Sequence, residues 1–341
     1  MLFPIFVAQG KSKARFKVGY ISQDGRVVID PIFEGGTLFY EGLASVRVKG
    51  GRWGVINSKG DFVIPPTLWN WCQFQEGLAG LASRTGKWGV IDVAGNQVVE
   101  PKYDWFQPFH EGLALVRVGS TVHAGDDARY CFIDRTGAET IPVQFHDAWD
   151  FSEGLAAVKV ADKWGYIRLS GEFAITPRFD GTGKAKRGAA KRAGRFVSGL
   201  APVWVGQDLY KFIDDKGSCA LDIAFDDANS FSEGRAMVGL NGRYGYIDVQ
   251  GRLAIDCRFT LARDFSDGLA RVEQEESRAG FSPPSGFIDH DGQMVIAPTL
   301  YSAESFRGGM SLVTTEKSIG YINRTGEFVW QGPFVEYGVL F

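Results

Sequence analysis

Residues 74–101 read FQEGLAGLASRTGKWGVIDVAGNQVVEP, and the rest of the 341-residue chain repeats this stretch. Its most constant feature is an Ile followed four residues later by a Gly, here Ile91 and Gly95. Nine repeats share it and are centred on Ile21, Ile56, Ile91, Ile133, Ile167, Ile213, Ile247, Ile288 and Ile322. Self-similarity at a constant period is the signature of stacked repeats, so residues 1–341 are predicted to form a single repeat array.

A second landmark is the run Phe-x-Glu-Gly-Leu-Ala, which begins at Phe74, Phe109 and Phe151 and recurs elsewhere in looser form. The base period is about 35 residues, which lies in the range of known repeat architectures. Three repeats are longer than this, and their extra residues form insertions at 119–129, 180–195 and 274–285.

Each repeat is predicted to be a β-meander. Leu113–Val118 and Trp88–Ile91 are rich in β-branched and aromatic residues, which favour strands. A third strand, Gln97–Val99, is expected to end before Pro101, because proline cannot donate to a strand ladder. The segment Tyr103–Phe109 is expected to add a fourth strand.

A tight hairpin is predicted between the second and third strands, because Asp92 can open the turn and Gly95 can close it. The fold class is therefore all-β, with about nine meanders of about 35 residues that resemble propeller blades. The blades could close into a ring or form an open, curved solenoid, and the sequence leaves both arrangements open.

Composition indicates an ordinary globular protein, with 45% hydrophobic and 23% charged residues. A net charge of -3 gives no reason to expect binding to nucleic acid. No apolar run approaches the roughly 20 residues of a membrane helix, and the first ten residues lack the basic start of a signal peptide. The four cysteines form no CxxC pair. We therefore predict a cytoplasmic protein with reduced thiols and no membrane partner.

The chain is predicted not to be an enzyme and to hold no cofactor or metal ion. Its histidines, His110, His123, His146 and His290, occupy different positions in the repeat and form no HExxH pair. The sequence contains neither a GxSxG nucleophile motif nor a phosphate-binding P-loop. A hydrolase that uses the repeated carboxylates is a third interpretation, weakened because these acids are spread evenly and are not paired in one cleft.

Acidic residues recur at both turns of the repeat. Glu41, Glu76, Glu111, Glu153, Glu233 and Asp267 precede one turn, and Asp92, Asp134, Asp214, Asp248 and Asp289 open the other. In an up-and-down meander both turns fall at the same end, so these acids would form a rim. The rim could collect cations or a basic partner, or the carboxylates could simply bind local backbone amides, which we favour.

One aromatic residue recurs before the Ile and usually precedes a Gly. Trp53, Trp88, Trp164, Tyr210 and Tyr244 occupy this position. Their rings could stack on sugars or hold cations. We favour a place in the core between repeats, because each small sheet must bury one face against its neighbour. The Gly beside the ring is expected to let the next layer approach closely.

The insertions are the strongest functional indication. Counting strand directions places all three at the end of the repeat opposite the acidic turns, and loops gathered on one face of a repeat scaffold are typical of a binding surface. The middle insertion is basic and could meet an acidic protein surface or a phosphate. The predicted partner-binding residues are Lys184, Lys186, Arg187, Lys191, Arg192, Arg195, His123, Asp126, Asp127, Arg278 and Phe281.

Lys87-Trp-Gly-Val-Ile-Asp92 and Lys163-Trp-Gly-Tyr-Ile167 resemble the bacterial WG-repeat family, also called KWG repeats. The resemblance covers nearly the whole chain. Ser285, Ile319 and Val18 depart from it at the aromatic position, and Cys131 and Lys211 depart at the Gly. Some family members resemble immunity proteins encoded beside secreted toxins, so the resemblance implies a toxin as one possible partner.

Two functions follow from these observations. The first is a non-enzymatic repeat scaffold that binds another protein, plausibly as the immunity or inhibitor partner of a bacterial toxin. The alternative is a carbohydrate or small-ligand binding module that uses the repeated Trp and Tyr residues.

Overall fold

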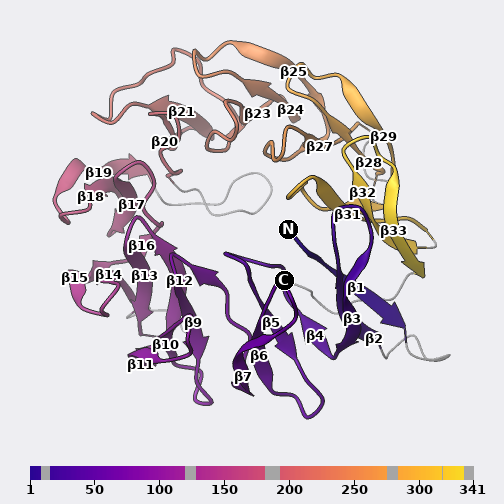
Figure 1. Ribbon diagram of the computed structural model, residues 1–341. Helices are drawn as coiled ribbons and strands as arrows, with labels where there is room; N and C mark the ends of the chain where they lie inside the picture. Colours follow the sequence, from indigo (N-terminus) through magenta and orange to yellow (C-terminus); the bar gives the residue numbers. More distant parts are fainter. Residues whose placement is uncertain (9–15, 120–127, 181–192, 275–282, 317, 334–341) are drawn as a thin grey trace. The chain divides into compact units, whose positions relative to one another are not determined.

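The computed structural model describes residues 1–8, 16–119, 128–180, 193–274, 283–316 and 318–333 (Figure 1). Within these ranges the chain forms strands, turns and loops, and no segment is helical. No helix that could cross a membrane is therefore found in the described residues. The chain divides into an N-terminal unit, which contains the described residues up to Phe151, and a C-terminal unit, which contains those from Ser152 onward.

The N-terminal unit contains a three-stranded sheet, three four-stranded sheets and one further short strand. In chain order these are β1 (Phe3–Ala8), β2 (Phe16–Ile21) and β3 (Val27–Phe33); β4 (Gly35–Gly36), β5 (Leu43–Arg47), β6 (Trp53–Asn57) and β7 (Phe62–Leu68); β8 (Phe74–Gln75), β9 (Leu78–Ala82), β10 (Trp88–Asp92) and β11 (Gln97–Tyr103); β12 (Trp105–His110), β13 (Leu113–Val118), β14 (Arg129–Asp134) and β15 (Glu139–Phe145); and β16 (Asp147–Ala148).

The C-terminal unit continues the pattern. Its strands are β17 (Leu155–Val160), β18 (Lys163–Arg168) and β19 (Phe173–Asp180); β20 (Ala201–Gly206) and β21 (Leu209–Ile213); β22 (Asp227–Ala228), β23 (Ala236–Leu240), β24 (Arg243–Ile247) and β25 (Leu253–Phe259); β26 (Leu261–Ala262), β27 (Ala270–Glu273), β28 (Ser285–Ile288) and β29 (Met294–Leu300); and β30 (Ser302–Ala303), β31 (Met310–Thr314), β32 (Ser318–Asn323) and β33 (Phe328–Pro333).

Every sheet is an antiparallel meander whose strands pair in chain order. The described residues form nine such sheets, and each contains one of the nine repeated Ile residues. The predicted all-β fold of propeller-like blades is therefore confirmed. The sixth sheet is reduced to β20 and β21, and isolated bridges at Tyr210–Phe225 and Ile213–Cys219 stand in place of its outer strand.

Consecutive sheets share their cores. In the N-terminal unit Phe6 and Tyr20 of the first sheet pack with Phe39 and Val46 of the second repeat. The aromatic residue directly before the repeated Ile packs against the Phe of the next Glu-Gly turn. Tyr20 and Phe39 are one such pair, and their ring centroids lie 5.0 Å apart. The same pair recurs in the C-terminal unit as Tyr166–Phe196, Tyr246–Phe265 and Phe287–Phe306. These aromatic pairs join one blade to the next.

The third strand does not end before Pro101. β11 runs on to Tyr103, and its register against β10 shifts between Val90–Val99 and Trp88–Tyr103, which marks a bulge. Pro101 is tolerated because β11 is the outer strand of its sheet, where a missing backbone donor faces no partner strand. The prediction that this strand stops at the proline was wrong.

The bulge explains the repeated Gly beside the aromatic residue. A Cβ atom added to Gly89 would lie 2.5 Å from the carbonyl oxygen of Val99 and 2.9 Å from the nitrogen of Pro101. Gly165 meets the same obstruction from Ile175 and Pro177. The close approach therefore comes from the outer strand of the same sheet and not, as expected, from the next layer.

Candidate functional site

The acidic turns adopt a strained backbone. Glu41, Glu76 and Glu233 have φ of 49°, 53° and 51°, a region that residues other than Gly adopt rarely, and the Gly that follows each of them also has positive φ. Two consecutive left-handed residues need compensating contacts. The carboxylates of these same residues provide them, as the C-terminal unit shows most clearly.

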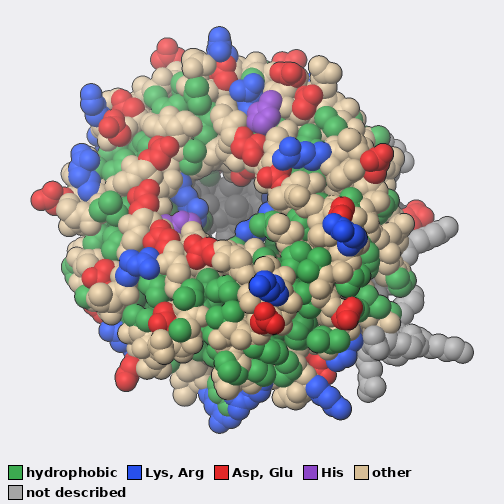
Figure 2. Space-filling view, in the orientation of Figure 1, with side chains coloured by type: hydrophobic (Ala, Val, Ile, Leu, Met, Phe, Trp, Pro, Cys, Tyr) green, Lys and Arg blue, Asp and Glu red, His purple; other side chains and the backbone are tan. Residues whose placement is uncertain are grey.

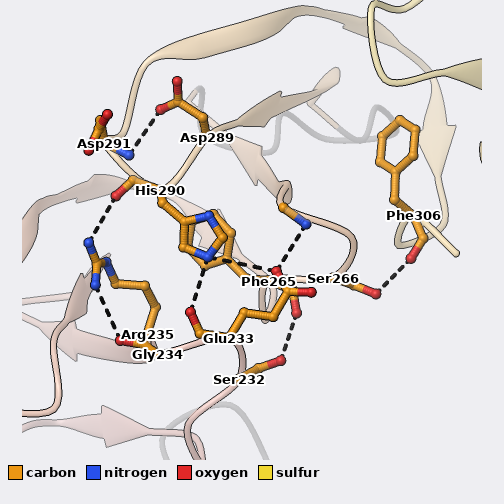
Figure 3. Close-up of polar contacts among 11 residues, drawn as sticks. Ser232, Glu233, Gly234, Arg235, Phe265, Ser266, Asp289, His290, Asp291 and Phe306 are labelled. Atoms are coloured by element: carbon orange, nitrogen blue, oxygen red, sulfur yellow. Dashed lines mark hydrogen bonds and ion pairs between the residues drawn. The ribbon is translucent and has the colours of Figure 1, made fainter. Parts of the chain in front are cut away.

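Glu233 binds the turn of the following repeat (Figure 3). Its Oε2 accepts a hydrogen bond from the backbone nitrogen of Gly268 at 2.9 Å. The neighbouring Ser232 donates its hydroxyl to the carbonyl oxygen of Phe265 at 2.7 Å. One repeat further on, Ser266 donates to the carbonyl oxygen of Phe306 at 2.6 Å. The turns at Glu233 and Asp267 are thus each fastened to the next turn by one carboxylate and one hydroxyl.

The carboxylate contact recurs along the chain. Glu41 accepts from the nitrogens of Glu76 and Gly77, and Glu76 in turn accepts from Gly112. In the C-terminal unit, Glu153 accepts from Ser198 and Gly199, and Asp267 accepts from Gly309. We had expected these carboxylates to bind local amides, but the amides belong to the next repeat. The stacking of the turns brings them within reach, which spacing inside one repeat does not reveal.

The Asp residues of the other turn do act locally, as predicted. Asp92 Oδ1 accepts from the nitrogens of Ala94 and Asn96 at 2.9 and 2.8 Å, and Gly95 closes the hairpin with φ of 85°. Bonding to the side chain of Asn96 and to these amides keeps the pKa of Asp92 below its usual value.

Both turns lie at the same end of their sheets. His290, which follows the hairpin residue Asp289, places Nε2 3.7 Å from Glu233 Oε2 and stacks its ring on Phe265 with centroids 4.2 Å apart (Figure 3). In the N-terminal unit Arg135 lies 3.6 Å from Glu76 in the equivalent arrangement. The predicted acidic rim therefore exists locally, and contacts within the scaffold engage its carboxylates.

The histidines do not converge on a catalytic group in the described residues. His110 Nδ1 lies 3.1 Å from Gln75 Nε2, and its Nε2 lies 3.4 Å from the buried carboxylate of Asp150. A base in a nucleophilic site needs a hydroxyl or thiol in that first position, and here it is an amide. His146 is exposed, and His123 lies outside the described residues. No group of three potential metal ligands occurs in the described part of the chain.

The repeated aromatic position belongs mainly to the core. Trp164, Tyr210 and Tyr244 are 1%, 7% and 8% exposed. Trp53 and Trp88 are half-buried, and the Trp88 ring stacks on Phe106 of the next sheet with centroids 6.3 Å apart. The core interpretation holds for the three buried rings, whose faces are covered by protein.

Two exposed tryptophans lie outside the repeated position. Trp69 and Trp71 are 42% and 45% exposed and occupy the link between β7 and β8. The guanidinium carbons of Arg52 and Arg84 lie 3.2 and 3.4 Å from the centroid of the Trp69 ring. Arg52 comes from the β5–β6 hairpin and Arg84 from the β9–β10 hairpin. This cluster lies at the end of its sheets opposite the Glu-Gly turns.

Sequence analysis missed this cluster. The second and third repeats have the base length, so no insertion drew attention to the link. The available signal was Trp69, which stands where other links carry a polar residue such as Glu34, Asp104 or Asp226. Large aromatic side chains in a link have no sheet face to cover, and this makes exposure the natural expectation.

Comparison with known proteins identifies the repeat. The family model described as "WG containing repeat" matches residues 19–52, 53–81, 88–121, 130–164, 164–203, 212–244, 244–276 and 286–317. The chain belongs to the WG-repeat family. No curated protein sequence matches it. The eight matched segments account for most of the chain, and the resemblance stated from the sequence is confirmed.

Two solved structures are similar to the WG-repeat chain at low identity. The computationally designed Ika8 protein shares 12% identity over 83% of this chain and 93% of its own, with a TM-score of 0.49. BamB from Moraxella catarrhalis shares 10% identity over 80% of this chain and 95% of its own, with a TM-score of 0.41.

Most of the predicted partner-binding residues lie outside the described residues. These are Lys184, Lys186, Arg187, Lys191, Arg192, His123, Asp126, Asp127, Arg278 and Phe281. Arg195 is described and half-buried. Its backbone nitrogen donates to Ser230 Oγ at 3.0 Å, and that hydroxyl donates back to the Arg195 carbonyl oxygen at 3.0 Å. Arg195 thus belongs to the anchored end of its insertion.

The flanking strands locate each insertion within its own WG repeat. Residues 119–129 join β13 to β14, and residues 274–285 join β27 to β28. Both replace the hairpin that carries Arg52 and Arg84 in shorter repeats. Residues 180–195 lead from β19 towards β20, the position that Trp69 and Trp71 occupy in the second repeat. In every case this is the end of the sheet opposite the acidic turn.

Proposed function

We propose that this WG-repeat chain is a non-enzymatic scaffold that binds another protein through the sheet ends opposite its acidic turns. The proposal rests on a difference between the connections at the two ends of the sheets. At one end the turns are alike from repeat to repeat and fasten to one another. At the other end the connections vary in length and expose Trp69 and Trp71. Repeat proteins place their variable, recognition-bearing loops on one face of a uniform scaffold.

The composition of the exposed cluster supports a protein partner. Trp and Arg are enriched in the residues that dominate binding energy at protein interfaces. The basic insertion residues Lys184, Lys186, Arg187, Lys191 and Arg192, together with Arg195, are proposed as further contacts. A toxin remains the partner class implied by family resemblance, and a cytoplasmic location remains a prediction.

Affinity capture from the native cell extract, followed by mass spectrometry, tests the proposal. The intact protein is compared with two variants, one lacking residues 182–194 and one carrying Trp69→Ala and Trp71→Ala. We expect a single stoichiometric partner that is lost from at least one variant. A variant with Arg26→Gln is the matched control, because Arg26 is highly exposed and pairs only with nearby Asp24. Absence of any partner from the intact protein would reject the scaffold function.

A second candidate is binding of a carbohydrate or another small ligand. It is favoured by the partial exposure of Trp53 and Trp88. A glycan panel screened by tryptophan fluorescence would test it. Unchanged fluorescence across the panel would contradict carbohydrate binding, and a saturable change abolished by Trp88→Leu would support it.

A further inference from the structure

We infer that Arg52, Trp69 and Arg84 form a binding site for an extended acidic peptide segment, with carboxylates at alternate positions that pair with the two guanidinium groups. The inference rests on the proposed protein-binding function and names the chemistry of the partner at this site.

The two arginines enclose the Trp69 ring. Their guanidinium carbons lie 3.2 and 3.4 Å from the ring centroid, about one van der Waals contact in each case. Two guanidinium groups this close to one centroid would overlap if they shared a face of the ring. They therefore lie on opposite faces, with the indole between them.

The stack holds both cations in place. A guanidinium over an indole face is attracted by the negative potential of the ring. Arg52 is further fixed by a hydrogen bond from Nη1 to the carbonyl oxygen of Thr67 at 3.0 Å. Side chains that are ordered before binding lose less entropy when a partner arrives, so this arrangement favours recognition.

The two guanidinium groups have no acidic partner within the described part of the chain. Lys87, which is in the same hairpin as Arg84, pairs with Asp104 at 2.7 Å. No corresponding ion pair forms at Arg52 or Arg84. Guanidinium edges bind carboxylates through two parallel hydrogen bonds, and one planar face of each guanidinium is already covered by the Trp69 ring. The N–H groups along the edge of each guanidinium can therefore bind an anion.

The spacing suits an extended chain. Because the two guanidinium carbons lie on opposite faces of the Trp69 ring, the distance between them is at most the sum of their distances from the ring centroid. In a β-strand, side chains at positions i and i+2 point the same way and lie about 6.6 Å apart. A Glu-x-Glu segment therefore presents two carboxylates at the separation of the two cations. The exposed Trp71, two residues further along the same link, offers an apolar contact for other residues of the peptide.

Nucleic acid is disfavoured as the ligand. Single strands bind by stacking bases on open aromatic faces along a basic groove. Both faces of Trp69 are covered by arginine, and the whole chain has a net charge of -3. A single-stranded oligonucleotide nevertheless enters the test as a competitor, so that the experiment distinguishes the two classes of polyanion.

Calorimetric titration of the full-length protein tests the inference. The probe is a synthetic peptide of alternating Ser and Glu, compared with a peptide in which Gln replaces Glu and one in which successive Glu residues stand three positions apart, so that in an extended chain they point to opposite sides. We expect saturable binding of the alternating peptide, weakened by added salt. Arg52→Gln and Arg84→Gln should each weaken it about tenfold, as expected for loss of one charge-assisted pair.

Arg26→Gln is the control variant, and thermal melting verifies that each variant is folded. Equal binding of the Glu and Gln peptides, no saturable binding of the alternating peptide, or tighter binding of the oligonucleotide would each overturn the inference. Partner capture by the intact protein is scored separately. If the Arg52→Gln and Arg84→Gln variants still capture the partner, this site is rejected, but the scaffold function is not.

Discussion

The carboxylate of Glu233 and the backbone nitrogen of Gly268 lie 2.9 Å apart, although the two residues belong to successive repeats. The bond links two turns whose backbones are both in the left-handed region, since Glu233 has φ of 51° and Gly268 has φ of 83°. It therefore supports the strained conformation of the next turn as well as the contact between sheets. This makes the acidic residue of each turn a structural element of the array.

Glu233→Ala should destabilise the protein by about 1 kcal/mol, because a charge-assisted hydrogen bond is lost at an exposed position. Glu233→Gln should cost less, since the amide oxygen can still accept from Gly268. Urea unfolding measures both changes, and hydrogen exchange at Gly268 reports the local effect. Glu172→Ala is the control, because that carboxylate contacts only Ser170 within its own turn. Unchanged exchange at Gly268 in Glu233→Ala would contradict the assignment.

Gly89→Ala should destabilise the protein by about 1–3 kcal/mol, the usual cost of forcing extra volume into a packed site. The added Cβ would lie 2.5 Å from the Val99 carbonyl oxygen, and the bulged outer strand would have to move. Thermal denaturation measures the effect. Cys131→Ala is the matched control, because Cys131 occupies the Gly position of the following repeat and already carries a Cβ. A melting temperature equal to that of the natural protein would contradict the prediction, because it would show that the outer strand moves aside without cost.

The parts of the fold that sequence predicts are those decided within a few residues. The hairpin from Asp92 to Gly95 was predictable because one side chain satisfies amides two and four residues away. The bond from Glu233 to Gly268 was not, because it depends on how far apart successive turns stack. The effect of Pro101 was predicted wrongly because a proline is tolerated in an outer strand. Only the order of strands in the sheet reveals that β11 is one.

The candidate site was less predictable than the fold. Insertions are visible in a sequence as departures from the period, and they directed attention to residues 119–129, 180–195 and 274–285. The Arg52–Trp69–Arg84 stack adds no residues to its repeats, and it joins three segments of two neighbouring sheets. Trp69 could signal an exposed aromatic side chain in the link, but only the packing of those sheets brings the hairpins of Arg52 and Arg84 onto its ring.

Asp134→Asn should remove one component of the acid sensitivity of the fold. Hydrogen bonding from the Thr136 side chain keeps the pKa of Asp134 below its usual value. A carboxyl group with a lowered pKa stabilises the folded protein above its unfolded-state pKa of about 3.9, and that contribution is lost as pH falls through the folded-state pKa. The difference in unfolding free energy between natural protein and variant should therefore shrink as the solution is acidified below about pH 4.

The substitution keeps the turn, because Asn57 and Asn323 hold the same hairpin with their Oδ1 atoms in other repeats. Urea unfolding across a pH series measures the difference. A gap between natural protein and variant that stays constant on acidification would contradict the assigned role. Glu100→Gln, at an exposed strand position, serves as the charge-matched control.

The cysteines should react with iodoacetamide in the order of their exposure. Burial raises the pKa of Cys72 to about 11 and that of Cys131 to about 12, so almost no thiolate forms at either site near pH 8. Cys219 is exposed and should be alkylated first.

Mass spectrometry of peptides after timed labelling measures the alkylation rates of Cys72, Cys131 and Cys219. Labelling in denaturant provides the reference state, in which the three rates converge. Early modification of Cys72 would contradict its position under Ser45, whose hydroxyl donates to the Cys72 carbonyl oxygen at 2.7 Å. Because Ser45 and Cys72 come from successive repeats, protection of this thiol also reports that the second and third sheets are packed together.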